Sequence, residues 1–180
     1  MLFSGQLVNL RAFRDEDIKP SVDFMNDMEI ILNLDDDAPM PQSYETQKEW
    51  FEEMRKNKKS YKDFFWAIET KDAKFIGGCG VNRMDGKNRL AQVGIFIGNQ
   101  DYLGKGYGTD AMKVLLEFLF EEYNVNKVKL LVFDYNKRAI KSYEKCGFQT
   151  EAIYRDSVFR YGKYQDMRSM AILKEEYFNR

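Results

Sequence analysis

Three glycines at alternate positions precede a long apolar stretch in QDYLGKGYGTDAMKVLLEFLFEE, residues 100–122. Gly104, Gly106 and Gly108 form a GxGxG pattern, which differs from the GxxxxGK[ST] phosphate loop and from the GxGxxG of dinucleotide-binding folds. Glycines allow successive backbone N–H groups to face one concavity, and a helix that follows adds its positive end. The pattern predicts an anion-binding loop. A turn that simply joins a strand to a helix is the alternative.

A second group of residues with chemical potential lies further along, in NKRAIKSYEKCGF, residues 136–148. Asn136, Ala139 and Tyr143 are spaced by three and four residues, so a helix places them on one face. A small residue between an amide and a phenol lets a ligand approach closely. The alternative is a packing stripe of Tyr143 and Ala139 with Asn136 as the N-cap. Gly147 is expected to end this helix in the left-handed conformation.

The two motifs, in this order and spacing, resemble those of the GNAT superfamily of N-acetyltransferases, and the likeness extends over essentially the whole chain. VNLRAFRDEDI near the start and YRDSVFRYGKYQDMRSMAIL near the end are similar to the branch that acetylates ribosomal-protein N-termini and polyamines. The resemblance implies one α/β (α+β) acetyltransferase domain over residues 1–180. Its central sheet would be mixed and mostly antiparallel, with about seven strands and helices on both faces.

The resemblance also implies that acetyl-CoA is the co-substrate and that its pyrophosphate lies on the glycine loop. The loop residues are Leu103, Gly104, Lys105, Gly106, Tyr107, Gly108 and Thr109. Leu103 departs from the family, which usually has Gln or Arg at this position. Backbone N–H groups supply most phosphate contacts, so binding should survive this change, and Lys105 could add a point charge.

The pantetheine arm would pair like an extra strand with the main chain of Ile95, Phe96 and Ile97. A backbone N–H there would also stabilise the oxyanion of the attacked thioester. Asn136 would contact the pantetheine, and Ala139 belongs to the same cofactor-facing side of its helix.

Tyr143 corresponds in this resemblance to the tyrosine that protonates the departing thiolate. A phenol with a pKa of about 10 can donate a proton or a hydrogen bond to a thiolate whose conjugate acid has a pKa of about 8.5. A tyrosine packed against the sheet is the alternative. The amine is expected to attack the thioester directly in a ternary complex, because neither cysteine lies in a nucleophile motif.

The sequence does not identify the general base. Many relatives have a Glu in a pattern like AELGI, whereas this chain has AQVGI with Gln92 at that position. An amide cannot accept the proton, although it could orient a water molecule. Glu69 and Asp85 are other candidate carboxylates, and no spacing selects either of them. An amine that binds already neutral needs no strong base.

The acceptor is expected to be a small-molecule amine or a peptide N-terminus. Asp35, Asp36 and Asp37 would attract a polycation such as spermidine or spermine, and would equally suit an amino sugar or a basic peptide N-terminus. Glu69 and Gln92 complete the candidate acceptor-binding set. A solvated loop or helix cap is the alternative for the aspartates. The aromatic residues of a C-terminal hairpin could wall an apolar slot or be ordinary sheet residues: Phe159, Tyr161 and Tyr164.

Two non-catalytic functions are alternatives to the enzyme. One is a sensor module that binds acyl-CoA, which Gln92 and Leu103 would favour and Asn136 and Tyr143 oppose. The other is a structural or interaction domain whose glycine loop is merely a turn, which the double motif disfavours.

Composition narrows the chemistry further. The chain has no histidine, which removes Ser-His-Asp and Cys-His nucleophile schemes and His-containing zinc sites, and no metal site is expected. The net charge of −1 provides no basic field for nucleic acid or an anionic membrane. Cys79 and Cys146 form no CxxC pair and are expected to be reduced. With no signal-peptide pattern or spanning segment, we expect a cytoplasmic protein, and a homo-oligomer stays open.

Hydrophobic periodicity predicts the elements that position these motifs. The first part of the chain should contain a strand at Leu7–Phe13, a helical region at 14–31 with a possible break at Pro20, a loop at 34–44 and a helix at 43–59. The second part should contain an antiparallel meander at 64–70, 74–84 and 89–98, a helix at 106–123, a strand at 126–133, a helix at 136–148 and a hairpin at 152–173 that turns near Gly162.

Overall fold

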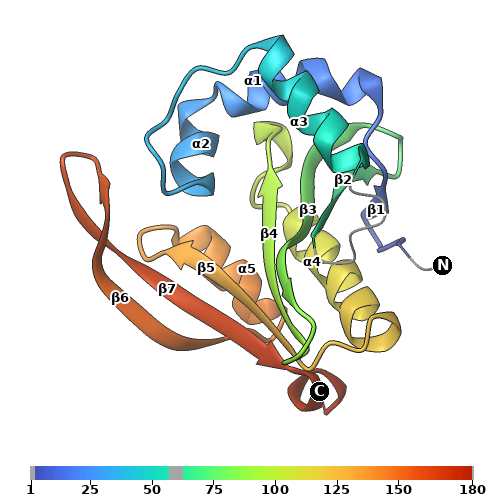
Figure 1. The fold of residues 1–180 in the computed structure, drawn as a ribbon, viewed down its shortest axis with the longest axis vertical. Helices are drawn as coiled ribbons and strands as arrows, with labels where there is room; N and C mark the ends of the chain where they lie inside the picture. The colour runs from blue at the N-terminus through green and yellow to red at the C-terminus, as the bar shows by residue number, and fades with distance from the viewer. Residues whose placement is uncertain (1–2, 57–62, 180) are drawn as a thin grey trace.

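A single seven-stranded sheet runs through the computed structural model, which describes residues 3–56 and 63–179 (Figure 1). Its spatial order is β1-β2-β3-β4-β5-β7-β6, and every neighbouring pair is antiparallel except β4 and β5. The predicted mixed, mostly antiparallel sheet is confirmed. The strands are β1 (Val8–Arg11), β2 (Phe64–Thr70), β3 (Phe75–Asp85), β4 (Leu90–Ile97), β5 (Lys127–Phe133), β6 (Gln149–Arg160) and β7 (Lys163–Leu173).

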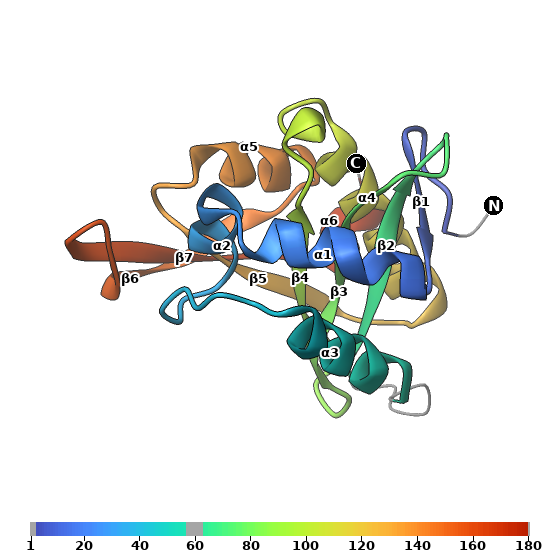
Figure 2. The same cartoon turned by 90° about the horizontal axis from the view of Figure 1, so that it is seen from above.

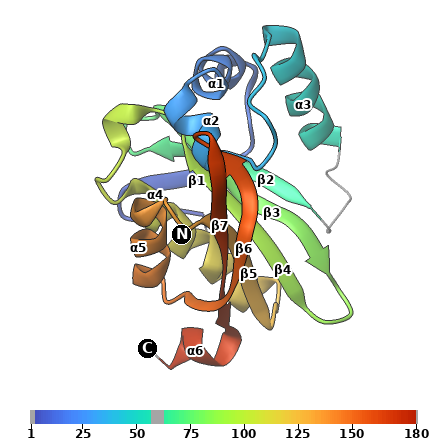
Figure 3. The same cartoon turned by 90° about the vertical axis from the view of Figure 1, so that its left-hand side faces the viewer.

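Helices cover both faces of the sheet, as Figures 2 and 3 show, with α3 on one side and α4 and α5 on the other. Two apolar clusters match these faces. One joins α1 and α3 to the sheet through Phe24, Phe51 and Ala67, and the other buries α4 against it through Met112 and Leu115. The helices are α1 (Ile18–Met25), α2 (Met28–Leu34), α3 (Tyr44–Lys56), α4 (Tyr107–Glu117), α5 (Lys137–Lys145) and α6 (Lys174–Phe178).

The N-terminal helical region is interrupted at a different place from the one predicted. Pro20 lies in the first turn of α1, where its missing N–H has no helical partner to lose, so the helix continues through it. The interruption falls at Asn26 and Asp27 instead, and the Asp27 side chain caps α2 by accepting a hydrogen bond from the N–H of Glu29 at 2.8 Å.

Several other boundaries differ slightly from the predictions. The chain continues after α4 as a wider helical turn to Glu122, and the short helix α6 was not predicted. The C-terminal hairpin turns at Tyr161 and Gly162, both with positive φ, as a two-residue hairpin turn requires. Residues 57–59 of the predicted helix at 43–59 lie outside the described residues. None of the described helices is long and apolar enough to cross a membrane.

The pairing of β4 with β5 is what opens the sheet. β4 pairs with β3 along its whole length, from Leu90 to Ile97, but with β5 only over Leu90, Ala91 and Gln92. Beyond Gln92 the two parallel strands diverge, and β5 continues alongside β7 (Figure 1). Within the described sheet, the edge of β4 from Val93 to Ile97 that faces β5 therefore has no strand partner.

The buried helix α4 is fastened to the start of the chain. The carboxylate of Asp110, in the first turn of α4, accepts hydrogen bonds from the backbone N–H groups of Gln6, Leu7 and Val8 at 3.1, 2.7 and 3.1 Å. Asp110 is therefore a link between α4 and β1, and the N-terminus of α4 is a fixed platform next to the opened strands.

Candidate active site

A cavity of about 720 Å³ occupies the opening between β4 and β5 and reaches both faces of the sheet. Trp50 and Met54 of α3 line it on one face, and Tyr143 and Lys145 of α5 line it on the other. The cavity brings together most of the predicted site residues: Asp35, Asp36, Gln92, Ile95, Phe96, Ile97, Leu103, Gly104, Gly106, Gly108, Thr109, Asn136, Ala139 and Tyr143.

The glycine loop forms one end of this cavity. Gly104 and Gly106 have φ angles of 71° and 93°, in the left-handed region that glycine adopts without strain. Gly106 is the N-cap of α4 and has no side chain to accept from the first-turn N–H groups, which therefore stay available to an anion. The hydroxyls of Thr109 and Ser142 lie 2.7 Å apart and connect this loop to α5.

Two predicted loop contacts point elsewhere. Lys105 is exposed, and Tyr107 packs its ring against Tyr102 with centroids 4.9 Å apart, and neither lines the cavity. The cations that do line the cavity are on α5, and the sequence analysis did not predict them: Arg138, Lys141 and Lys145. Their spacing of three and four residues places them on one helical face and could have revealed them.

The free edge of β4 runs along the middle of the cavity. Ile95 and Ile97 point into the core beneath α4, and Phe96 packs on the opposite face beneath α1 and α3. Toward β5 the main chain between these side chains has no strand partner among residues 3–56 and 63–179, so an extended ligand can pair with its N–H and C=O groups as a strand would.

Asn136 starts α5 and has two potential roles at once. Its side-chain oxygen accepts a hydrogen bond from the N–H of Ala139 at 3.1 Å, so it is the N-cap of the helix. The amide NH₂ group is a separate donor, so capping does not prevent Asn136 from also binding a ligand carbonyl.

The turn before α5 is held by Asp134. This carboxylate accepts from Lys137 at 2.7 Å and from Arg168 of β7 at 2.5 Å. The hydrogen bond from Lys137 and then those from Arg168 hold the pKa of Asp134 below its usual value. Asp134 thereby joins β5, α5 and β7 close to the cavity.

Tyr143 lies one turn after Ala139 on the cavity side of α5. Its ring packs edge-on against Phe148 with centroids 5.9 Å apart, which fixes its direction. Burial raises the pKa of the phenol above its usual value, and the neighbouring Cys146 adds to this rise. The phenol therefore stays protonated and can act as a donor. Cys146 and Cys79 are both buried and unbridged, as expected for reduced structural thiols.

The other half of the cavity carries carboxylates: Glu29 of α2, Asp35 and Asp36 after it, and Asp63 immediately before β2. Glu29 forms an ion pair with Arg138 at 3.4 Å across the opening. Sequence reasoning did not identify Glu29 or Asp63, because their placement depends on how distant segments pack.

The loop with the three aspartates is attached to the C-terminal hairpin. The buried guanidinium of Arg160 donates to the carbonyl oxygens of Asp35 and Asp37 at 2.7 and 2.5 Å. Asp37 itself does not line the cavity, and its backbone serves this attachment. The hairpin aromatics Phe159, Tyr161 and Tyr164 are exposed and lie outside the lining residues.

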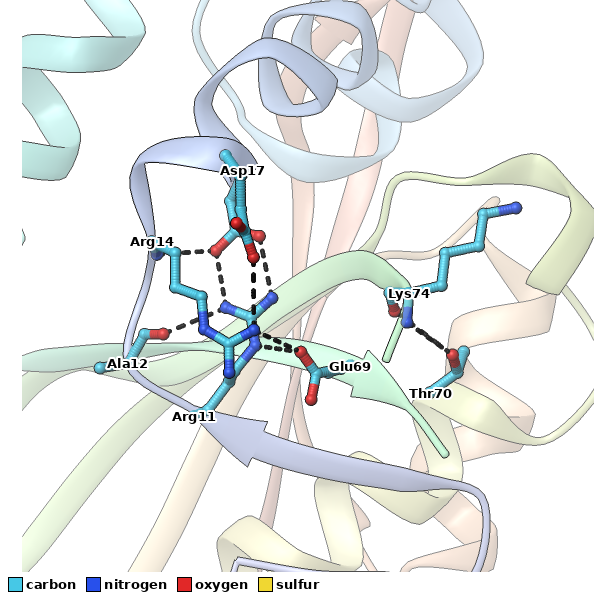
Figure 4. Close-up of polar contacts among 8 residues, drawn as sticks. Arg11, Ala12, Arg14, Asp17, Glu69, Thr70 and Lys74 are labelled. Carbon is cyan, nitrogen blue, oxygen red and sulfur yellow. Dashed lines mark hydrogen bonds and ion pairs between the residues drawn. The ribbon is translucent and has the colours of Figure 1, made fainter. Parts of the chain in front are cut away.

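The two carboxylates considered as general bases also lie outside the cavity. Glu69 is buried and accepts from Arg11 and Arg14, and Arg11 also forms two hydrogen bonds with Asp17 at 2.7 and 2.9 Å (Figure 4). This cluster joins β1, β2 and the start of α1. Asp85 is the half-buried last residue of β3, where hydrogen bonds from Asn88 lower its pKa. Glu69 therefore belongs to an ion-pair cluster that lies outside the cavity lining.

Three features lie together in this cavity: a sheet opened between parallel strands, a glycine loop at a helix N-terminus beside the opening, and a protonated phenol. Together they are typical of a protein that binds an acyl-CoA and presents its thioester to an acceptor. The chain belongs to the acetyltransferase (GNAT) domain family, which it matches over residues 8–149.

Comparison with individual proteins supports this assignment. The chain is 31% identical, over 97% of its length and 94% of the relative's, to the SPbeta prophage-derived uncharacterized N-acetyltransferase YokL of Bacillus subtilis. It is 30% identical to spermidine N(1)-acetyltransferase of Vibrio cholerae over 64% of this chain and 66% of that protein. A crystal structure of spermidine N-acetyltransferase from Vibrio cholerae, in complex with CoA and spermine, superposes with a TM-score of 0.84 at 26% identity, covering 96% and 98% of the two chains. The protein is an N-acetyltransferase that uses acetyl-CoA and acts on an amine, which confirms the enzyme reading.

Proposed function

We propose that this enzyme acetylates a primary amine of a polyamine such as spermidine or spermine. The observation that carries the proposal is the distribution of charge in the cavity. Glu29 on α2, Asp35 and Asp36 after it and Asp63 before β2 line one part of the cavity, whereas Lys141 and Lys145 line it from α5. Carboxylates attract an acceptor with several ammonium groups, and cations attract the phosphates of coenzyme A.

Each part of the cofactor half has a proposed task. The backbone N–H groups at the start of α4 hold the pyrophosphate, and the free edge of β4 between Val93 and Ile97 pairs with the pantetheine. Asn136 donates to a pantetheine carbonyl. Acetyl-CoA supplies an activated thioester, and a main-chain N–H of β4 stabilises the negative charge that develops on its oxygen. Tyr143 donates its proton to the departing sulfur.

Spermidine is the acceptor named for relatives of this chain from Vibrio cholerae and Escherichia coli, and spermine is bound in the structure with the TM-score of 0.84. These names support a polyamine acceptor here. A peptide N-terminus remains the competing acceptor and is one outcome of the test below.

The test is thiol release from acetyl-CoA by the purified protein, with spermidine, spermine, an amino sugar and basic N-terminal peptides as acceptors. We expect saturable release with the polyamines at lower concentrations than with the other amines. The KM for the polyamine should rise with ionic strength, because surface and cleft charges are screened by salt. Saturable release with only the peptide or the amino sugar would overturn the polyamine assignment.

A further inference from the structure

Three polar side chains form a row across the acceptor face of the sheet. Asp63 immediately precedes β2, Asn82 is on β3 and Gln92 is on β4. In the register of these strands, Phe65 lies opposite Gly80 and Gly80 lies opposite Gly94. Side chains alternate along a strand and opposite residues share a face, so Asp63 projects on the side of Phe65, and Gln92 on the same side through Gly94. The register between β3 and β4 shifts at Asn82, because Gln92 lies opposite Arg83. The side of Asn82 is therefore given by its contacts.

Contacts around Gly94 support this placement. A Cβ atom built on Gly94 would lie 3.0 and 3.1 Å from the amide nitrogen and oxygen of Asn82, so the Asn82 side chain lies over this glycine. Gln92 is two residues away on the same face. The absence of a side chain at Gly94 gives the Asn82 amide its position in the middle of the row.

All three side chains line the cavity, together with Trp50 and Phe65 on the α3 face. Tyr143 lines the cavity from α5, on the opposite face (Figure 2). An amine that enters beneath α3 therefore meets this row on one side of the thioester, while the leaving sulfur lies toward Tyr143. Strands two positions apart are separated by about 10 Å, so the carboxylate of Asp63 needs a bridging water to reach the neighbourhood of Gln92.

We propose that Asp63 is the base that deprotonates the acceptor amine, through a water held by Asn82 and Gln92. Among the carboxylates that line the described cavity, Asp63 is the one carried by the sheet wall. Glu29 lies on α2, and Asp35 and Asp36 belong to the loop held by Arg160. The inference rests on the amine entering beneath α3, as proposed above.

The proton balance of this step is complete. One N–H proton of the ammonium group passes through the water to Asp63, and the neutral nitrogen forms the N–C bond as the C–S bond breaks. Tyr143 gives its phenol proton to the sulfur. The acetylated nitrogen then loses its second N–H proton, which replaces the proton lost by the phenol through exchange with solvent. The net products are the amide, the CoA thiol and one proton. Gln92, which cannot be a base, has a defined task as a water ligand.

The test is the pH dependence of kcat/KM for Asp63→Asn, measured with the best amine of the acceptor panel. We expect a loss of about 10- to 100-fold near neutral pH, because the variant acts only on amine that is already neutral. The loss should diminish as the pH rises toward the amine pKa, while the acetyl-CoA Kd stays unchanged. Asp85→Asn, at the end of β3 and outside the cavity lining, is the matched control and should behave like the wild type.

A second variant separates a base from a merely attractive charge. Adding Gln92→Glu to Asp63→Asn places a carboxylate at the other end of the row and should recover at least about 10-fold of the lost activity at neutral pH. Asn82→Ala should show a smaller loss with the same pH dependence. A change in the amine KM alone, with an unaltered pH profile, would overturn the proposal, as would a loss that Gln92→Glu does not recover. Absence of thiol release by the wild type with polyamines would instead refute the proposed acceptor.

Discussion

The two parts of the cavity that we propose for the cofactor and for the acceptor, the cofactor half and the acceptor half, are formed by different kinds of group. The cofactor half consists of backbone: left-handed glycines, a helix N-terminus and a strand edge without a partner, with Asn136 and Tyr143 fixed on one helix face. The acceptor half consists of charged side chains from α2, the loop after it, and the segment before β2. A ligand common to a whole family can be held by backbone, whereas the ligand that distinguishes its members is selected by side chains.

A second contrast lies along β2. Asp63 and Glu69 stand at opposite ends of this strand, and both are carboxylates that sequence alone would permit as bases. Asp63 lines the cavity, whereas Glu69 is surrounded by the guanidinium groups of Arg11 and Arg14 (Figure 4). Tertiary packing alone separates a carboxylate that lines the cavity from one that is held between two guanidinium groups.

The largest effect should come from the cofactor half. Tyr143→Phe removes the proton donor while keeping the ring that packs on Phe148, so kcat should fall about 100- to 1000-fold. The acetyl-CoA Kd should change less than about 3-fold, since backbone groups hold the cofactor. Thiol release and equilibrium titration measure the two quantities. Tyr154→Phe, on the exposed part of β6, is the control. Equal losses in rate and cofactor affinity would make Tyr143 a packing residue.

The next largest effect should be on stability at the far end of β2. Glu69→Gln leaves the half-buried guanidinium of Arg11 without one of its two carboxylates, which should lower the free energy of unfolding by about 2–3 kcal/mol. Urea denaturation measures this change, and kcat per folded molecule should be unaltered. Glu16→Gln alters an exposed partner of Arg14 and should cost less than about 0.5 kcal/mol. A lower kcat with unchanged stability would contradict this structural role and indicate that Glu69 takes part in the reaction.

The smallest effect should come from the turn before α5 and should depend on pH. Asp134→Asn should lower the free energy of unfolding by about 1 kcal/mol at neutral pH, since the pair with Arg168 and Lys137 is partly exposed. The folded-state pKa of Asp134 lies below its usual value, so the carboxylate stabilises the fold above the unfolded pKa of about 3.9. This contribution is lost as the pH falls through the lowered pKa. The two proteins should therefore converge in acid, and a constant difference across this range would contradict the assignment.

Local signals made much of the fold predictable. β2 was predicted at its observed bounds, and β3 and β4 within a residue or so, because alternation and turn residues mark short strands strongly. The break between α1 and α2 was misplaced because proline was weighed above Asp27, whose capping position before Glu29 was also a signal.

The acceptor half could not be predicted in the same way. The cavity depends on β4 leaving β5 after Gln92, and the position of Asp63 depends on the register across three strands. Neither is encoded in the local pattern of one segment. The three aspartates are equivalent in sequence, but only Asp35 and Asp36 line the cavity, and Arg160 of β6 holds the loop through the carbonyl oxygens of Asp35 and Asp37.

The most direct test of the account is a crystal structure of the protein with CoA and spermine bound together. We predict pyrophosphate on the loop around Gly104 and Gly106, pantetheine amides paired with the β4 main chain between Val93 and Ile97, and an amine nitrogen on the α3 side near Asp63. Pantetheine bound away from the β4 edge, or both ligands on the same face of the sheet, would contradict a cavity that crosses the sheet to join its two substrates.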